Sequence, residues 1–232
     1  MLNKRLAIDI GSQKLRMIVK GEDAIWEEPA PVNALSSYSI VDRAALEESF
    51  THLIQKAIGR QRIFKPDVMV AVSCALPSSD RRAMLDVLVG CGARTAYLMD
   101  VPLAASLSYG EGISPEPRVV VHLGYSHLQA AVVVGESSLT LASVPFVTGD
   151  DLVAKTRKLV DEVVVSAPKP VQERLLTGIV TGGRSDQAIA DGLSDAGIKF
   201  TCPEQPELAP VKGISAALDH FDVLKKAFLY LR

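Results

Sequence analysis

The chain has 232 residues, of which 48% are hydrophobic and 22% are charged, the composition of a globular protein with one large core or two modest ones. The formal net charge is only −2 at pH 7 and the basic residues are scattered, so charge gives no attraction to nucleic acid or to an anionic membrane. Apolar stretches such as Ala130–Gly135 are far too short to span a bilayer, and the N-terminal residues hold no signal region. The sequence therefore predicts a cytoplasmic protein with no direct membrane segment and no nucleic-acid partner.

The first half of the chain predicts a β-hairpin followed by alternating helices and strands. Two short apolar runs, residues 6–10 and 15–19, flank the polar turn Ser12-Gln13-Lys14, which is the pattern of a hairpin. Apolar residues at helical spacing then predict a helix over residues 44–58, with Asp42 as its N-cap. The remaining predicted elements are a strand over 68–72, a helix over 80–92, a strand over 95–99 and a small-residue helix over 102–110.

The second half repeats this order, displaced by 113 positions from Gly11 to Gly124. Residues 119–123 and 128–134 again predict a hairpin. A helix over 151–164, a strand over 176–181, a helix over 186–197, a strand over 198–202 and a helix over 211–218 follow. A last predicted helix, residues 221–232, has no counterpart in the first half, and we expect it to cross back onto the first domain.

The same order of elements twice predicts an internal repeat. Alternating strands and helices indicate an α/β fold with parallel strands added beside each hairpin. The Gly- and Pro-containing segment Glu111–Arg118 is the natural linker. We therefore predict two domains, residues 1–112 and residues 113–232.

Several stretches resemble the superfamily of actin, sugar kinases and heat-shock chaperone ATPases, and within it MreB, the bacterial rod-shape actin. The stretches are Ile8-Asp9-Ile10-Gly11-Ser12, which resembles a first phosphate loop, Gly92–Leu98 with Pro102–Ser106, which resembles the surroundings of the catalytic glutamate, Gly178–Gly183, which resembles an adenosine loop, and Ala217-Leu218-Asp219. The resemblance implies two tandem RNase H-like (actin-like ATPase) domains, each a mixed sheet that opens with a β-hairpin and is covered by helices. It also implies that both small subdomains are missing, because the segments after residues 27–29 and 149–151 are too short to contain them.

The resemblance further implies a site for ATP or ADP with Mg²⁺, in which two glycine turns hold the phosphates through backbone N–H groups. The matching residues are Asp9, Gly11, Ser12 and Lys14 in the first turn, Gly124 in the second, and Thr181, Gly182 and Gly183 in the adenosine loop. Asp9 is the candidate Mg²⁺ ligand. The alternatives are structural: an Asx-type turn for Asp9, a solvated surface lysine for Lys14 and a tight turn for the glycine pair.

Three departures from the family pattern weaken this site. His122 replaces an aspartate in the second turn, and imidazole is a poor ligand for Mg²⁺. Tyr125 and His127 add bulk where backbone should approach phosphate. Val101 stands at the position of the carboxylate that orients water, while the adjacent Asp100 is expected to cap the following helix. The sequence thus predicts no catalytic residue, little or no ATP hydrolysis and weak nucleotide binding.

The resulting hypothesis is an MreB-like cytoskeletal-family protein with a degenerate nucleotide site. It would act through protein–protein contacts in filament assembly, cell shape or related scaffolding, with an actin-like filament, another scaffold protein or itself as partner. One alternative is a miniature ATP-binding filament former. Another is an accessory or chaperone protein of a microcompartment or of a type IV pilus system, and a third is a two-domain α/β protein that shares only the fold.

Overall fold

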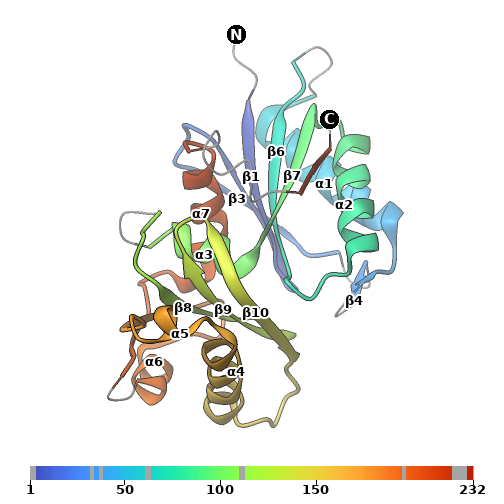
Figure 1. Ribbon diagram of the computed structural model, residues 1–232. Coiled ribbons are helices and arrows are strands. Elements are labelled where there is room, and N and C mark those ends of the chain that lie inside the picture. The colour runs from blue at the N-terminus through green and yellow to red at the C-terminus, as the bar shows by residue number, and fades with distance from the viewer. Residues whose placement is uncertain are drawn as a thin grey trace. The chain divides into compact units, whose positions relative to one another are not determined.

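The protein folds into two compact units, seen in a computed structural model (Figure 1) that describes residues 4–31, 34–36, 39–60, 64–109, 113–194, 197–220 and 229–231. The first unit comprises Met1–Met99 with Ile214–Arg232, and the second comprises Asp100–Gly213. The domain limits predicted from the repeat, 1–112 and 113–232, remain a prediction. In this division by compactness, the chain returns to the first unit at its C-terminal end.

The first unit contains a six-stranded mixed sheet in the order β13-β7-β6-β1-β2-β3. Its centre is the predicted hairpin, β1 (Arg5–Ile10) and β2 (Lys14–Val19), which pair antiparallel. On one side β6 (Asp67–Val72) runs parallel to β1, and β7 (Thr95–Asp100) follows it. On the other side β3 (Ile25–Pro29) pairs antiparallel with β2. The two-residue strands β4 (Leu35–Ser36) and β5 (Ser39–Ile40) form a separate small sheet.

Two helices, α1 (Arg43–Ile58) and α2 (Ser78–Gly90), pack side by side and cover this sheet (Figure 1). The predicted cap is confirmed, since the Asp42 side chain accepts a hydrogen bond from the Ala45 N–H at 3.0 Å. Fully buried side chains from α1, such as Leu46 and Phe50, join those of the hairpin, such as Leu6 and Met17, in one core. Apolar positions at helical spacing therefore face apolar positions at strand spacing.

The C-terminal segment differs from the sequence prediction. A helix was expected over residues 221–232, but Leu229–Leu231 form a strand, β13, that pairs antiparallel with β7; residues 221–228 lie outside the described residues. Local spacing cannot reveal this pairing, because the hydrogen-bond partners are the backbone groups of β7. Lys20 also holds the segment before it, with its Nζ 2.5 Å from Asp219 Oδ2 and 3.1 Å from the Ser215 carbonyl oxygen.

The second unit contains a five-stranded sheet in the order β10-β9-β8-β11-β12. The hairpin β8 (Arg118–Leu123) and β9 (His127–Val134) is extended by the antiparallel strand β10 (Ser137–Pro145). On the other side, β11 (Thr177–Thr181) and β12 (Lys199–Thr201) run parallel to β8. The third strands of the two sheets, β3 and β10, were not predicted, because the first contains Glu27, Glu28 and Pro29 and the second is rich in serine.

Helices cover both faces of the second sheet (Figure 1). On one face lie α4 (Leu152–Ser166) and α6 (Gln187–Leu193), capped by Asp151 and Asp186, and on the other lies α3 (Val101–Leu107). The short α5 (Lys169–Gln172), the 3-10 turn η1 (Pro206–Leu208) and α7 (Ala209–Ala217) complete the described helices. A methyl group on Gly213 of α7 would overlap the Ala104 carbonyl oxygen of α3, so glycine permits this close contact.

The hairpin turns of the two units match each other atom for atom. The Gly11 N–H donates to the Lys14 carbonyl oxygen at 3.0 Å, and the Gly124 N–H donates to the His127 carbonyl oxygen at 2.9 Å. A Cβ atom on either glycine would lie 2.9 Å from that oxygen. The repeat and the α/β fold class predicted from the sequence are confirmed. The connections that precede α1 (30–42) and α4 (146–151) hold, in their described parts, no element beyond β4 and β5.

Candidate nucleotide half-sites

Asp9 lies near the end of β1 with only 4% of its surface exposed. The register places it opposite Arg16 of β2, and Arg16 Nη1 is 3.6 Å from Asp9 Oδ2. Burial raises the pKa of Asp9 to about 6, although the charge of Arg16 and its hydrogen bond act to lower it. The predicted Mg²⁺ ligand is therefore a buried carboxylate that already has a cation beside it.

The remaining first-turn residues divide into two kinds. Lys14 Nζ is 2.6 Å from Glu27 Oε2, and Arg16 Nε is 2.9 Å from Glu27 Oε1, so Glu27 of β3 engages both cations. Ser12 is exposed and Gly11 is partly exposed at the tip of the hairpin. The structure thus leaves Gly11 and Ser12 open to a ligand and holds Lys14 against its own sheet.

In the second unit, His122 takes the place that Asp9 has in the first. His122 Nδ1 lies 3.2 Å from Thr181 Oγ1, and the Thr181 hydroxyl donates to the Val121 carbonyl oxygen at 3.0 Å. Because Thr181 is fully buried, its hydroxyl joins β11 to β8 inside the unit. Gln129 occupies the position opposite His122, so the acid–base pair of the first hairpin is not repeated.

Tyr125 and His127 of the second turn point in different directions. His127 is 6% exposed, its Nδ1 is 3.0 Å from Ser126 Oγ, and burial lowers its pKa. Its ring therefore lies within the unit and does not fill the turn. Tyr125 is 41% exposed and is the residue that adds bulk at the turn.

The loop after β11 packs directly on this turn. Gly182 has φ of +103°, and a Cβ atom there would lie 2.5 Å from the Leu123 carbonyl oxygen, so only glycine fits. A Cβ atom on Gly183 would lie 2.8 Å from the Tyr125 ring. Arg184, which the sequence analysis did not select, places its Cζ 5.1 Å from the centroid of the Tyr125 ring and 4.5 Å from that of Phe146.

The helix α3 begins with the two residues expected near a catalytic carboxylate. Asp100 occupies its N-cap position, but its side chain makes no capping hydrogen bond, so the predicted capping role is wrong. Val101 is 3% exposed, and its hydrocarbon side chain can neither accept nor donate a proton. Within the described ranges, no group of three or more His, Cys, Asp or Glu side chains is arranged to hold a metal ion. These residues do not fit a protein-held Mg²⁺ site, whereas the two glycine turns fit phosphate groups.

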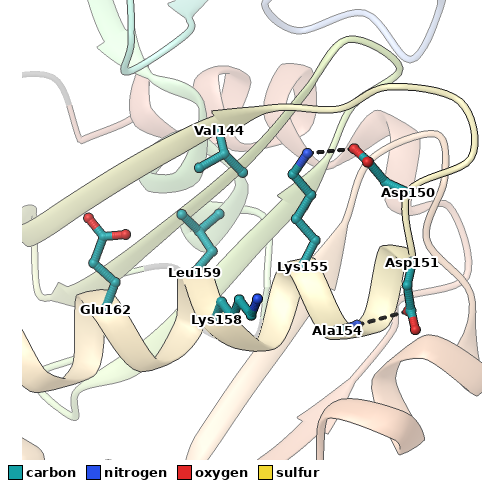
Figure 2. Close-up of a pocket in the computed structure, with 8 residues that line it drawn as sticks. All are labelled: Val144, Asp150, Asp151, Ala154, Lys155, Lys158, Leu159 and Glu162. Carbon is teal, nitrogen blue, oxygen red and sulfur yellow. Dashed lines mark hydrogen bonds and ion pairs between the residues drawn. The ribbon is translucent and has the colours of Figure 1, made fainter.

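A pocket of about 420 Å³ lies in the second unit between the end of β10 and the helix α4. Figure 2 shows its eight lining residues, Val144, Asp150, Asp151, Ala154, Lys155, Lys158, Leu159 and Glu162. Two of its charged groups are engaged: Lys155 Nζ is 2.5 Å from Asp150 Oδ2, and Asp151 caps α4. It contains none of the predicted nucleotide residues and is a separate hollow.

A family model described as MreB/Mbl protein matches residues 3–164. The chain belongs to the MreB/Mbl family. It is 23% identical over 169 residues to the cell shape-determining protein MreB of Pasteurella multocida (strain Pm70), an alignment that covers 57% of this chain and 48% of that protein. The chain therefore spans about half the length of this curated relative.

Solved structures of other family members share the fold. Crystal structures of MreB5 of Spiroplasma citri bound to ADP and to AMPPNP match with TM-scores of 0.79 and 0.77, each at 12% identity; the first match covers 97% of this chain and 98% of that one, and the second 98% and 99%. The ethanolamine utilization protein EutJ from Carboxydothermus hydrogenoformans matches with a TM-score of 0.70 at 16% identity, over 92% of this chain and 89% of that one. These likenesses confirm two tandem actin-like ATPase domains. In the described part of the MreB/Mbl chain, no helix has the length and apolar character needed to cross a membrane.

Proposed function

We propose that this MreB/Mbl chain acts through protein–protein contacts in a cell-shape or scaffolding assembly and hydrolyses ATP slowly or not at all. The observation that carries the proposal is Val101. It stands buried at the first residue of α3, where the resemblance to MreB places the glutamate that orients the attacking water. Phosphoryl transfer needs a polar group there, and a valine side chain has none.

Weak nucleotide binding belongs to the same proposal. Gly11 and Gly124 keep the turn geometry in which backbone N–H groups can approach phosphate. The two structures of MreB5 contain ADP and AMPPNP, which supports a nucleotide as the ligand class. Against tight binding stand the buried Asp9–Arg16 pair and the replacement of a second carboxylate by His122.

The edges of the two sheets support a role in protein contacts. The edge strand β3 carries Glu27 and Glu28, whose charges are paired with Lys14, Arg16 and Lys56. The edge strand β10 has no charged residue along its nine positions, and Leu139 and Leu141 are 43% and 42% exposed. Charged side chains on an edge strand oppose pairing with another chain, so β10 is the edge suited to such pairing.

Sedimentation tests the proposal directly. The purified chain is pelleted alone and with a full-length MreB-type actin, in the presence of ATP, ADP or neither. We expect co-pelleting or self-association whose extent does not follow the nucleotide. Loss of all association in every condition would contradict a role in protein contacts.

Two other functions have specific support. The nucleotide-bound structures of MreB5 favour a miniature ATP-dependent filament former, which predicts pelleting only with ATP. The likeness to EutJ favours an accessory protein of an ethanolamine-type microcompartment, which predicts that the gene lies beside genes of that system.

A further inference from the structure

The guanidinium group of Arg184 is held by aromatic rings and not by a carboxylate. It lies over Tyr125 and Phe146 at cation–π distances of 5.1 and 4.5 Å. Stacking of this kind uses the flat faces of a guanidinium and leaves its N–H edge available for a two-pronged hydrogen bond. The arrangement fixes the orientation of the cation in advance.

The polar atoms of this group lack acceptors within the described ranges. No carboxylate lies within ion-pair distance of Arg184, and its side chain makes no hydrogen bond there. Its Nε atom is buried without a partner, and so is the hydroxyl oxygen of the adjacent Ser185. Because buried donors in native proteins nearly always have a partner, two neighbouring unpaired donors indicate a ligand that supplies oxygen atoms.

The loop that carries these donors is fixed at several points. The Gly182 N–H donates to the Pro206 carbonyl oxygen at 2.8 Å, and the Arg184 N–H donates to the Leu123 carbonyl oxygen at 3.2 Å. The Gly183 Cα lies so close to the Tyr125 ring that a side chain would not fit. A ligand would therefore meet donors that are already positioned, which lowers the ordering cost of binding.

We propose that Arg184 and Ser185 form a binding site for a phosphoryl oxyanion, either free phosphate or a phosphate group of a nucleotide. A tetrahedral oxyanion has acceptor oxygens outside a single plane, so it can meet the guanidinium edge and the Ser185 hydroxyl together. A carboxylate has two oxygens, which the guanidinium edge alone would occupy. The site deepens the proposed function and rests on it only where the phosphate comes from a nucleotide. Arg184 would then supply, beside the second turn, a positive charge that stands in for backbone donors crowded by Tyr125.

Nitrogen-15 NMR of the full chain tests the site through the Nε–H signal of Arg184, identified as the signal missing from Arg184→Lys. Titration with inorganic phosphate should shift this signal to saturation, and titration with acetate should require about tenfold higher concentration, since acetate cannot reach both donors. ADP titrated separately shows whether a nucleotide phosphate shifts the same signal. An Arg184 signal that phosphate leaves unmoved would overturn the site, and equal response to acetate would overturn its tetrahedral class.

Calorimetry with phosphate supplies the matched variants. Arg184→Gln should bind phosphate about tenfold more weakly, because a charge-assisted hydrogen bond is lost. Arg174→Gln, which removes an exposed arginine paired with Glu116, should bind as the unaltered chain does. Equal affinity in both variants contradicts the site. These measurements contain neither ATP nor a filament, so their failure and the failure of the proposed function remain distinguishable.

Discussion

Asp9 and Arg16 face each other across the first hairpin, with Oδ2 and Nη1 3.6 Å apart and with only 5% and 15% of their side chains exposed. At the equivalent positions of the second hairpin stand His122 and Gln129. One carboxylate of the expected metal site is thus engaged inside its own unit, and the other is absent from the sequence. This difference between the two repeats underlies the proposal of a weak nucleotide site.

The ionisation of Asp9 should affect stability in a defined pH range. Because the pKa of Asp9 is raised from 3.8 to about 6 in the folded state, its protonated form favours folding below about pH 4, and this contribution is lost as the pH rises through about 6. Asp9→Asn removes the titration. Relative to the unaltered chain, the variant should gain up to about 3 kcal/mol in the free energy of unfolding between pH 4 and pH 8, at about 1.4 kcal/mol per pKa unit.

Urea unfolding of both proteins at several pH values measures this gain. A variant that is less stable than the unaltered chain at pH 8 would show that the ionised Asp9–Arg16 pair is a net stabilising interaction.

Gly182 should not tolerate a side chain. Its positive φ and the Leu123 carbonyl oxygen 2.5 Å from the Cβ position predict that Gly182→Ala costs about 2–4 kcal/mol, since backbone strain and steric overlap add. Gly135→Ala is the matched control, because Gly135 also has positive φ but has no atom within 4 Å of the Cβ position; it should cost about 1 kcal/mol. Thermal unfolding compares the two, and equal losses would contradict the close packing of the loop on the turn.

Gly213 provides a second pair of glycine variants, this time in helices. Gly213→Ala should destabilise the protein by about 2 kcal/mol or more, because the new methyl group overlaps the Ala104 carbonyl oxygen. Gly192→Ala in α6 meets only Val153 at an ordinary 3.5 Å, and alanine favours a helix by about 1 kcal/mol over glycine. We expect opposite signs in chemical denaturation, and a stabilising Gly213→Ala would exclude the close contact of α7 with α3.

The uncharged edge of β10 should respond to a single charge. Leu141→Lys places a cation on the exposed face of the edge strand, and it should reduce self-association because a buried charge opposes strand pairing. Leu176→Lys is the matched control, since Leu176 is 65% exposed but lies before β11 and not on the edge. Analytical ultracentrifugation over a concentration series distinguishes them. An equal effect of both variants would indicate that association uses another surface.

The sequence predicted the parts of the fold that depend on local periodicity. The turns at Gly11 and Gly124 and the cap at Asp42 were readable because their partners lie within a few residues. The strands β3, β10 and β13 were not, because their pairing depends on neighbouring strands and their sequences carry polar residues or a weak pattern. Tertiary pairing overrides local propensity in such segments.

The candidate site was predictable in its residues and not in their environment. The sequence marks Asp9 and Thr181, but only the structure shows that one faces Arg16 and the other bonds to Val121. Arg184 could not be selected, because its contacts with Tyr125 and Phe146 join residues far apart along the chain. The burial of Val101 agrees with its apolar character.

Steady-state phosphate release from Mg²⁺-ATP tests the central claim most directly. The account predicts that the full chain releases phosphate no faster than buffer alone, and that Asp9→Ala changes nothing, because no side chain near Val101 orients water. Steady Mg²⁺-dependent release that disappears in Asp9→Ala would contradict the account and establish a working ATPase.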